Sequence, residues 1–166
     1  MRGGVIALGI VLMLGIVLML AACGEAPKKV EAPPPDPTLE ASYGQAVAEL
    51  AAAAREAKVL RAAGKNDAAA AVITKAQPQI AAVLAAPHPT LAAMEAASDL
   101  DELYGQMLLA NKNYGWARML FQKNRSRWTH WSPQTGDTAR RLKQANEAIA
   151  ECDREIFRAA TVRERP

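Results

Sequence analysis

The stretch Leu91–Ser126 (LAAMEAASDLDELYGQMLLANKNYGWARMLFQKNRS) carries the pattern that decides the fold. Its apolar residues recur every three or four positions, at Ala93, Ala96, Leu100, Leu103, Met107, Ala110, Tyr114, Ala117 and Phe121. This spacing places them on one face of an α-helix. Ser98 to Asp101 also fits a capping box, which leaves a restart at Ser98 open. Because the register does not shift, we expect one helix of about 36 residues, roughly 54 Å long.

Similar apolar seams lie on both sides of this stretch. One follows the cap sequence Asp36-Pro37-Thr38 and ends at Gly64, and a second begins at a cap formed by Asn66-Asp67. Pro78 falls between seam positions, where a helix survives with a kink, and 87–90 (PHPT) ends that segment. The last seam follows a loop at 131–136 and a cap at Asp137, and comprises Leu142, Ala145, Ile149, Cys152, Ile156 and Ala159. No segment alternates as a strand does. The sequence therefore predicts an all-α domain over 38–166, an antiparallel bundle of about four helices with alanine-rich, heptad-like seams.

The first 24 residues have the layout of a secretory signal peptide. Met1-Arg2 supplies a positive charge, 5–22 carries no charged residue, and Leu20-Ala21-Ala22-Cys23 closes the apolar run. This ending resembles the lipobox of bacterial lipoproteins. The resemblance implies cleavage after residue 22, a lipid on Cys23, and retention in the outer membrane, because Gly24 rather than Asp follows the cysteine. The alternative is an uncleaved signal anchor, since about 18 apolar residues just span a bilayer.

A proline-rich spacer joins Cys23 to the helical domain. Residues 25–37 read EAPKKVEAPPPDP, and at about 3.1 Å per residue this stretch reaches roughly 40 Å. We therefore expect a signal peptide at 1–22, a lipidated linker at 23–37 and the bundle at 38–166. In a cell with two membranes, this organisation predicts a lipid-anchored protein that faces the periplasm.

The charge balance gives no sign of nucleic acid as a partner. Without the signal peptide the net charge is about +2, but its distribution is uneven. Residues 36–111 hold five basic and nine acidic side chains, whereas 112–166 hold twelve basic and six acidic ones. This asymmetry orients the domain toward an anionic surface, or it reflects two complementary halves of one bundle.

No motif of a known catalytic chemistry is present. The chain has no phosphate loop, nucleophile elbow or metalloprotease helix, and its two histidines, His88 and His130, stand apart from other metal ligands. Asp99 and Glu102 share a helix face, and we expect them to be solvated or to cap a helix end. A pocket around them with a raised carboxyl pKa would instead favour acid–base chemistry. We expect no catalytic residue, no metal and no cofactor.

Cys152 lies within the last apolar seam. Its position predicts a buried, inert thiol. The alternative is a redox role or an intermolecular disulfide, because a lipidated Cys23 could not pair with it.

The stretch 123–131 (KNRSRWTHW) combines basic and aromatic side chains. Such mixtures bind anionic polymers by charge and stacking, and Arg and Trp are enriched at protein interfaces. The candidate binding residues are Lys123, Arg125, Arg127, Trp128 and Trp131. In the alternative reading, the two tryptophans close the end of the bundle and the arginines complement the helix dipole.

Two segments are similar to tetratricopeptide repeats. One copy comprises Tyr104, Gly105, Leu108, Tyr114, Ala117 and Phe121, and the other Ala57, Leu60, Gly64, Ala69, Ile73 and Ala76. Repeats of that family recur about every 34 residues, whereas the corresponding Gly64 and Lys112 are 48 residues apart. The resemblance implies helical hairpins that form a peptide-binding scaffold.

Together these features predict a non-catalytic envelope lipoprotein. Its helical domain is expected to bind an envelope protein as an interaction or scaffold module. The alternative is an anionic envelope component, a cell-wall polymer or a lipid head group, bound through 123–131.

Overall fold

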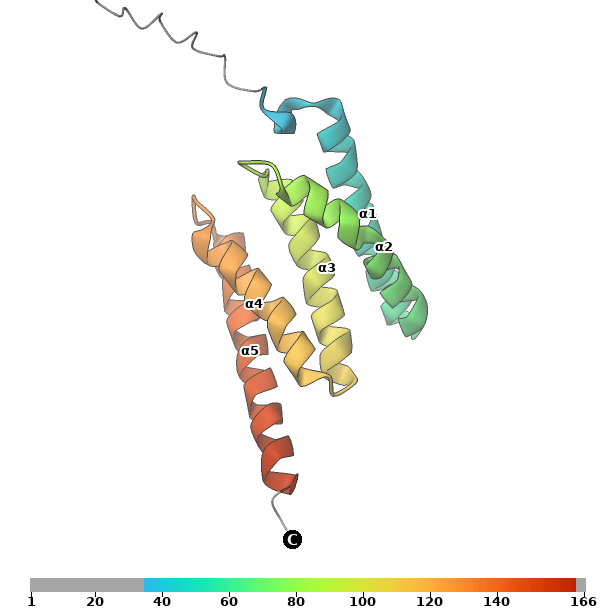
Figure 1. The fold of residues 1–166 in the computed structure, drawn as a ribbon, viewed down its shortest axis with the longest axis vertical. Helices are drawn as coiled ribbons and strands as arrows, with labels where there is room; N and C mark the ends of the chain where they lie inside the picture. The colour runs from blue at the N-terminus through green and yellow to red at the C-terminus, as the bar shows by residue number, and fades with distance from the viewer. Residues whose placement is uncertain (1–34, 164–166) are drawn as a thin grey trace, which may run out of the picture. The chain divides into compact units, whose positions relative to one another are not determined.

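Five α-helices follow one short 3₁₀ turn in residues 35–163, the part of the chain that the computed structural model describes (Figure 1). They are η1 (Pro37–Leu39), α1 (Ala41–Ala62), α2 (Asn66–Leu84), α3 (Leu91–Ala110), α4 (Tyr114–His130) and α5 (Gly136–Arg163). The predicted all-α class is therefore confirmed. The predicted signal peptide, Cys23 and most of the predicted linker lie outside the described residues.

The predicted single helix over Leu91–Ser126 is wrong, and with it the count of four helices. The chain reverses at Asn111–Asn113, so that α3 and α4 are antiparallel neighbours. Lys112 has a φ of 61°, and the Asn113 amide donates to the Leu108 carbonyl at 2.8 Å. The seam misled the prediction because three loop residues happen to preserve the spacing of three and four across the turn. No restart occurs at Ser98, which lies inside α3.

The turns at 63–65 and 111–113 have the same geometry. Gly64 has a φ of 75°, close to that of Lys112, and the Lys65 amide donates to the Leu60 carbonyl at 2.9 Å as Asn113 does to Leu108. Both are the left-handed turns that commonly close helices. The helices α1–α2 and α3–α4 are therefore two equivalent hairpins spaced by 48 residues.

Helix ends follow the predicted caps in part. The Asp36 carboxylate accepts from the Thr38 amide at 2.9 Å, as expected, although only the turn η1 follows it directly. The predicted cap at Asn66-Asp67 is wrong, because α2 begins at Asn66 and its cap residue, Lys65, makes no side-chain capping bond. Pro78 lies within an unbroken α2.

The start of α5 also differs from the expectation. Asp137 lies in the first turn of α5, and Thr135 caps it instead. The Thr135 amide donates to Thr138 Oγ1 at 2.8 Å, and the Thr138 amide donates to Thr135 Oγ1 at 3.2 Å. This reciprocal pair is a capping box built from two threonines, and it satisfies two amides that the helix itself leaves unpaired.

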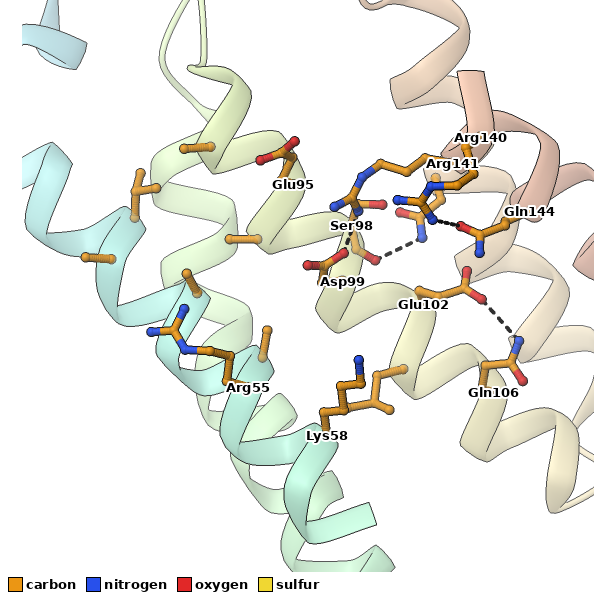
Figure 2. Close-up of a pocket in the computed structure, with 18 of the residues that line it drawn as sticks. Arg55, Lys58, Glu95, Ser98, Asp99, Glu102, Gln106, Arg140, Arg141 and Gln144 are labelled. Atoms are coloured by element: carbon orange, nitrogen blue, oxygen red, sulfur yellow. Dashed lines mark hydrogen bonds and ion pairs between the residues drawn. The ribbon is translucent and has the colours of Figure 1, made fainter. Parts of the chain in front are cut away.

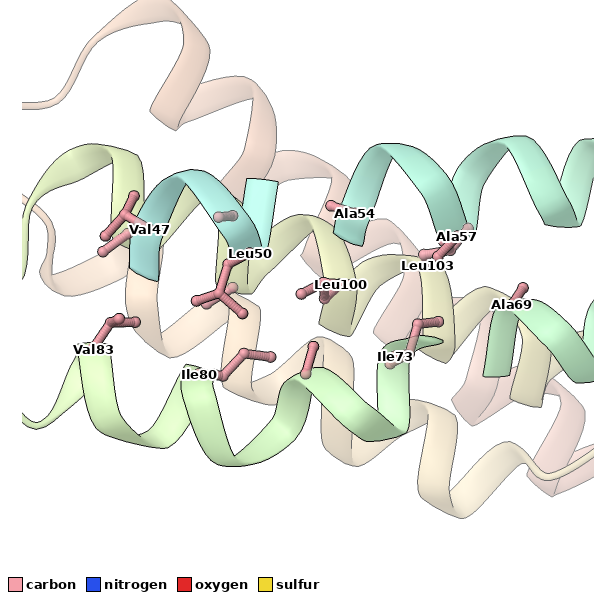
Figure 3. Packing of buried hydrophobic residues seen from close by; sticks show 14 of the residues in the cluster. Val47, Leu50, Ala54, Ala57, Ala69, Ile73, Ile80, Val83, Leu100 and Leu103 are labelled. Carbon is pink, nitrogen blue, oxygen red and sulfur yellow. The ribbon is translucent and has the colours of Figure 1, made fainter. Parts of the chain in front are cut away.

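The first three helices pack around an alanine-rich core. Helix α3 packs against both helices of the first hairpin, and α5 packs against α4. Large side chains from the three helices, among them Leu50, Ile73 and Leu100, form this core together with alanines such as Ala54, Ala57 and Ala69 (Figure 3). Small residues allow helix axes to approach closely, so these helices form a packed layer with little buried area per residue.

A second cluster joins the second hairpin to α5. It consists of Ala117, Phe121, Ala148, Ile149 and Cys152. The Cys152 thiol is fully buried and unpaired, which confirms its predicted position in the core. Burial raises the pKa of this thiol, and Glu151 and Asp153 raise it further. A thiol that resists ionisation is a poor nucleophile.

Gly105 of α3 lies against the ring of Phe121 of α4. A Cβ added there would lie 2.7 Å from Cε1 of Phe121, whose ring is fully buried and has no room to retreat. We expect Gly105→Ala to lower the free energy of unfolding by about 1–3 kcal/mol, although alanine is the better helix former. Urea unfolding followed by far-UV circular dichroism measures this change.

Gly115→Ala is the matched control, because a Cβ at Gly115 meets no atom within 4 Å. It should stabilise α4 by up to about 1 kcal/mol. Equal stabilisation by the two substitutions would show that α3 and α4 do not pack at this distance.

Candidate functional site

The stretch 123–131 contributes both to the core and to the surface. Trp128 is fully buried, and its indole N–H donates to Ser98 Oγ at 3.0 Å. The Asn124 amide donates to the Ser98 carbonyl at 3.0 Å. The guanidinium of Arg141, from α5, stacks over the Trp128 ring, with 5.4 Å between Cζ and the ring centroid. Trp128 therefore holds α3, α4 and α5 together.

A buried ion pair occupies the same layer. Asp101 has no exposed surface, and its carboxylate binds the Arg127 guanidinium at 2.8 Å and the Lys123 ammonium at 3.1 Å. Arg127 is itself almost buried and also donates to Asn124. These contacts use Arg127 and Trp128 within the fold. A partner could not reach Trp128 without opening the helix packing, and Arg127 keeps only a small exposed surface.

The other three candidate residues lie toward the surface. Arg125 is exposed, Trp131 is half-buried, and the Lys123 side chain is partly exposed although it contacts Asp101. A shallow hollow of about 420 Å³ runs along this side of α3 and α4, lined by Met94, Lys123, Ser126, Arg127, His130 and Trp131. The predicted binding role of 123–131 stays a prediction, with this hollow as its accessible part.

A larger groove lies between α1, α3 and α5. Its volume is about 920 Å³, near the upper end of the range typical of ligand sites (Figure 2). Its apolar lining comes from α1 and α3, through Val47, Ala51, Ala54, Ala96 and Leu103. Its polar lining comes from all three helices and includes Arg55, Lys58, Arg61, Glu95, Asp99, Glu102, Gln106, Arg140, Arg141 and Gln144. The groove thus brings together side chains from segments far apart in the sequence.

Most charges on the α5 side of the groove are paired. Arg141 binds Asp99 of α3 and also Asp137, at 2.8 Å, in the first turn of α5. Arg140 binds Asp137 and donates to Gln144 at 3.0 Å. The pKa of the Asp137 carboxyl is lowered by its hydrogen bonds to Arg141 and Arg140. These contacts fix the α5 wall against α3.

Glu102 is the carboxyl group that the groove perturbs most clearly. It is half-buried, and burial raises its pKa above the ordinary value of 4.5, although a hydrogen bond from Gln106 at 3.1 Å and the charge of Arg61 partly oppose the shift. Asp99 and Glu102 therefore do line one pocket. However, Asp99 is engaged by Arg141, so the two do not form an unpartnered acid–base couple.

Glu102→Gln should stabilise the protein at neutral pH. Because the pKa of Glu102 is higher in the folded state than in the unfolded state, folding favours the protonated carboxyl group. Its full contribution to the stability is therefore present below pH 4.5 and is lost as the pH rises past the pKa of the folded state. Glutamine avoids that loss and should raise Tm at pH 7. The gain should vanish near pH 4, as thermal melts across this range would show.

Glu56→Gln, at an exposed position of α1, serves as the control and should change Tm little at either pH. A gain for Glu102→Gln that persists unchanged at acidic pH would contradict the assignment of a raised pKa.

Sequence reasoning missed the groove. The sequence did contain a sign of the basic wall, because Arg55, Lys58 and Arg61 recur every three residues and so lie on one side of α1. Its other walls had none, because neighbours along α3 and α5 do not reveal which helices face each other. Among the described residues no group of three or more His, Cys, Asp or Glu side chains is placed to hold a metal ion.

Comparison of the chain with protein-family models, with curated proteins and with solved structures finds no match. In the described part of the chain, no helix has the length and apolar character needed to cross a membrane. The groove and the N-terminal sequence are therefore the features of the chain that bear on its function.

Proposed function

We propose that this chain is a membrane-tethered, non-catalytic domain that binds a partner protein in the groove between α1, α3 and α5. The observation that carries the proposal is the groove itself, about 920 Å³ of open space walled by three helices with mixed apolar and charged side chains. Such a surface is suited to a protein segment, which offers both kinds of contact. The two stacked hairpins supply a rigid frame for it.

The tether comes from the N-terminal sequence. The lipobox-like Leu20-Ala21-Ala22-Cys23 supports a lipid on Cys23, and the proline-rich 25–37 supports a spacer between membrane and domain. In this proposal the domain stands in the periplasm, attached to the outer membrane, and meets an envelope protein there.

Site-specific photocrosslinking in cells that express the full chain tests the proposal. A photoreactive residue at Gln106 or Gln144, which line the groove, should capture the same segment of one protein, identified by mass spectrometry. The same residue at Lys75, an exposed position of α2, is the control and should capture none. Cys23→Ala should remove the chain from the membrane fraction or leave it unprocessed.

Capture from Lys75 as efficient as from the groove, or no capture from Gln106 and Gln144, would contradict partner binding in the groove. A processed Cys23→Ala chain that still fractionates with membranes would contradict the lipid anchor.

A second candidate function is binding of an anionic wall polymer or lipid head group through 123–131. The hollow beside Trp131 favours it, because Lys123 and His130 border an aromatic surface there. Co-sedimentation with isolated cell wall or with anionic vesicles tests this function, and Arg125→Gln/His130→Gln should weaken it. No sedimentation at low salt would exclude it.

A further inference from the structure

The groove has one wall whose charges are not neutralised within the described fold. Arg55, Lys58 and Arg61 line it from α1, and none of them takes part in the ion pairs found in the described residues. The guanidinium groups of Arg140 and Arg141, on the α5 side, both bind carboxylates. Figure 2 shows Lys58 extending from α1 into the space toward α3.

The missing pairs are not explained by a shortage of carboxylates. Residues 36–111 carry nine acidic and only five basic side chains, and three of those five bases form this row. Of the three acidic residues in the groove, Asp99 is paired with Arg141, whereas Glu95 and Glu102 form no ion pair in the described residues and do not balance the three bases. The row therefore keeps an excess of positive charge beside open space, where the low-dielectric walls strengthen its field.

We infer that the groove binds an acidic peptide segment, whose carboxylates contact Arg55, Lys58 and Arg61. This inference rests on the proposed function and specifies the chemistry of the partner. The three positions span about 9 Å of helix. Alternate side chains of an extended peptide point to the same side and are about 6.7 Å apart, so two acidic residues separated by one other residue match the row. The side chain between them points away from α1, toward the apolar lining that α3 contributes.

Fluorescence anisotropy with the full chain and short labelled probes tests the inference. The probes are a fluorescein-labelled hexapeptide of alternating Glu and Ala and its counterpart of alternating Gln and Ala. The Glu probe should bind, and its Kd should rise between about 50 and 300 mM NaCl because the contacts are exposed charge pairs. The Gln probe should bind at least about tenfold more weakly, as the loss of a few such contacts predicts.

Two triple variants, which remove the same number of positive charges, distinguish contacts with this row from attraction of the probe to the net charge of the protein. Arg55→Gln/Lys58→Gln/Arg61→Gln should weaken binding of the Glu probe by about tenfold or more. The control comprises three exposed positions outside the groove lining, Lys65→Gln/Lys75→Gln/Lys112→Gln, and should change the Kd less than about twofold. Circular dichroism melts confirm that both variants fold.

Equal loss of affinity in the two variants would overturn the inference, because it would show attraction to net charge alone. Equal binding of the Glu and Gln probes would also overturn it, while groove crosslinks from Gln106 and Gln144 would still uphold the proposed function. Absence of both probe binding and groove crosslinks would reject the two together.

Discussion

Trp128→Ala should lower the free energy of unfolding by about 3–5 kcal/mol, as removal of a large buried aromatic side chain does. The indole is fully buried between α3, α4 and α5, and its N–H binds Ser98. Its loss would leave a cavity, an unpartnered Ser98 hydroxyl and an Arg141 guanidinium without its stacking surface. Urea unfolding followed by far-UV circular dichroism measures the effect without depending on the lost fluorophore.

Trp116→Ala is the matched control on the same helix. The Trp116 side chain is 64% exposed, so its removal should change stability by no more than about 0.5 kcal/mol. The same comparison bears on function, because Trp128 was a candidate for direct partner binding. A Trp128→Ala chain that unfolds like the wild type but loses its partner would contradict the structural role assigned to this residue.

Asp101→Ala should cost about 3–5 kcal/mol, because it removes one partner of a buried ion pair. Asp101 is fully buried, and the almost buried guanidinium of Arg127 would lose its carboxylate and keep only its contact with Asn124. Lys123 can turn to solvent, since its side chain is partly exposed. The cost is thus expected to come mainly from the uncompensated charge on Arg127.

Asp153→Ala is the control for this substitution. Asp153 pairs with Arg118 at 2.6 Å across α4 and α5, but both side chains are largely exposed, so the expected cost is at most about 1 kcal/mol. The double variant Asp101→Leu/Arg127→Met should be more stable than Asp101→Ala, because it removes the orphaned charge. If the double variant loses as much stability as the two single substitutions lose together, the interaction between Asp101 and Arg127 contributes no coupling energy.

The two hairpins share their backbone geometry but differ in the chemistry of one layer. Their turns match at Gly64 and Lys112. A shift of 48 positions matches one buried layer of the first hairpin with one of the second. In the first hairpin this layer is apolar, formed by Leu50, Ala76 and Ile80. The corresponding residues of the second hairpin are polar or amphipathic, namely Ser98, Asn124 and Trp128. The second hairpin thereby gains hydrogen bonds that fix how α3 and α4 meet, at the cost of burying polar groups that must all be paired.

Local sequence was sufficient for the helices and for most of their ends. The spacing of apolar residues predicted α1, α2 and α5 but joined α3 and α4 into one helix, and Gly64 and the prolines at 87 and 89 predicted two of the breaks. It was insufficient at Asn111–Asn113. The periodicity of apolar residues depends only on their spacing along the sequence. A three-residue turn that keeps this spacing therefore cannot be detected from it. The left-handed residue of this turn is Lys112, whereas Asn111 and Asn113 have φ of −86°. The sequence did carry one sign of the turn, the tetratricopeptide-like spacing that matches Lys112 with Gly64.

What the sequence by itself determined is therefore the all-α class and the seams, whereas the lipid anchor on Cys23 stays a prediction. Only the tertiary structure decided that α3 and α4 are two helices, that Trp128 and Arg127 lie inside, and that a groove exists. The physical reason is that helix periodicity depends on residues three or four apart, whereas burial and grooves depend on helices that are distant in sequence. Arg55 and Arg141 line the same groove, yet no local pattern relates one to the other.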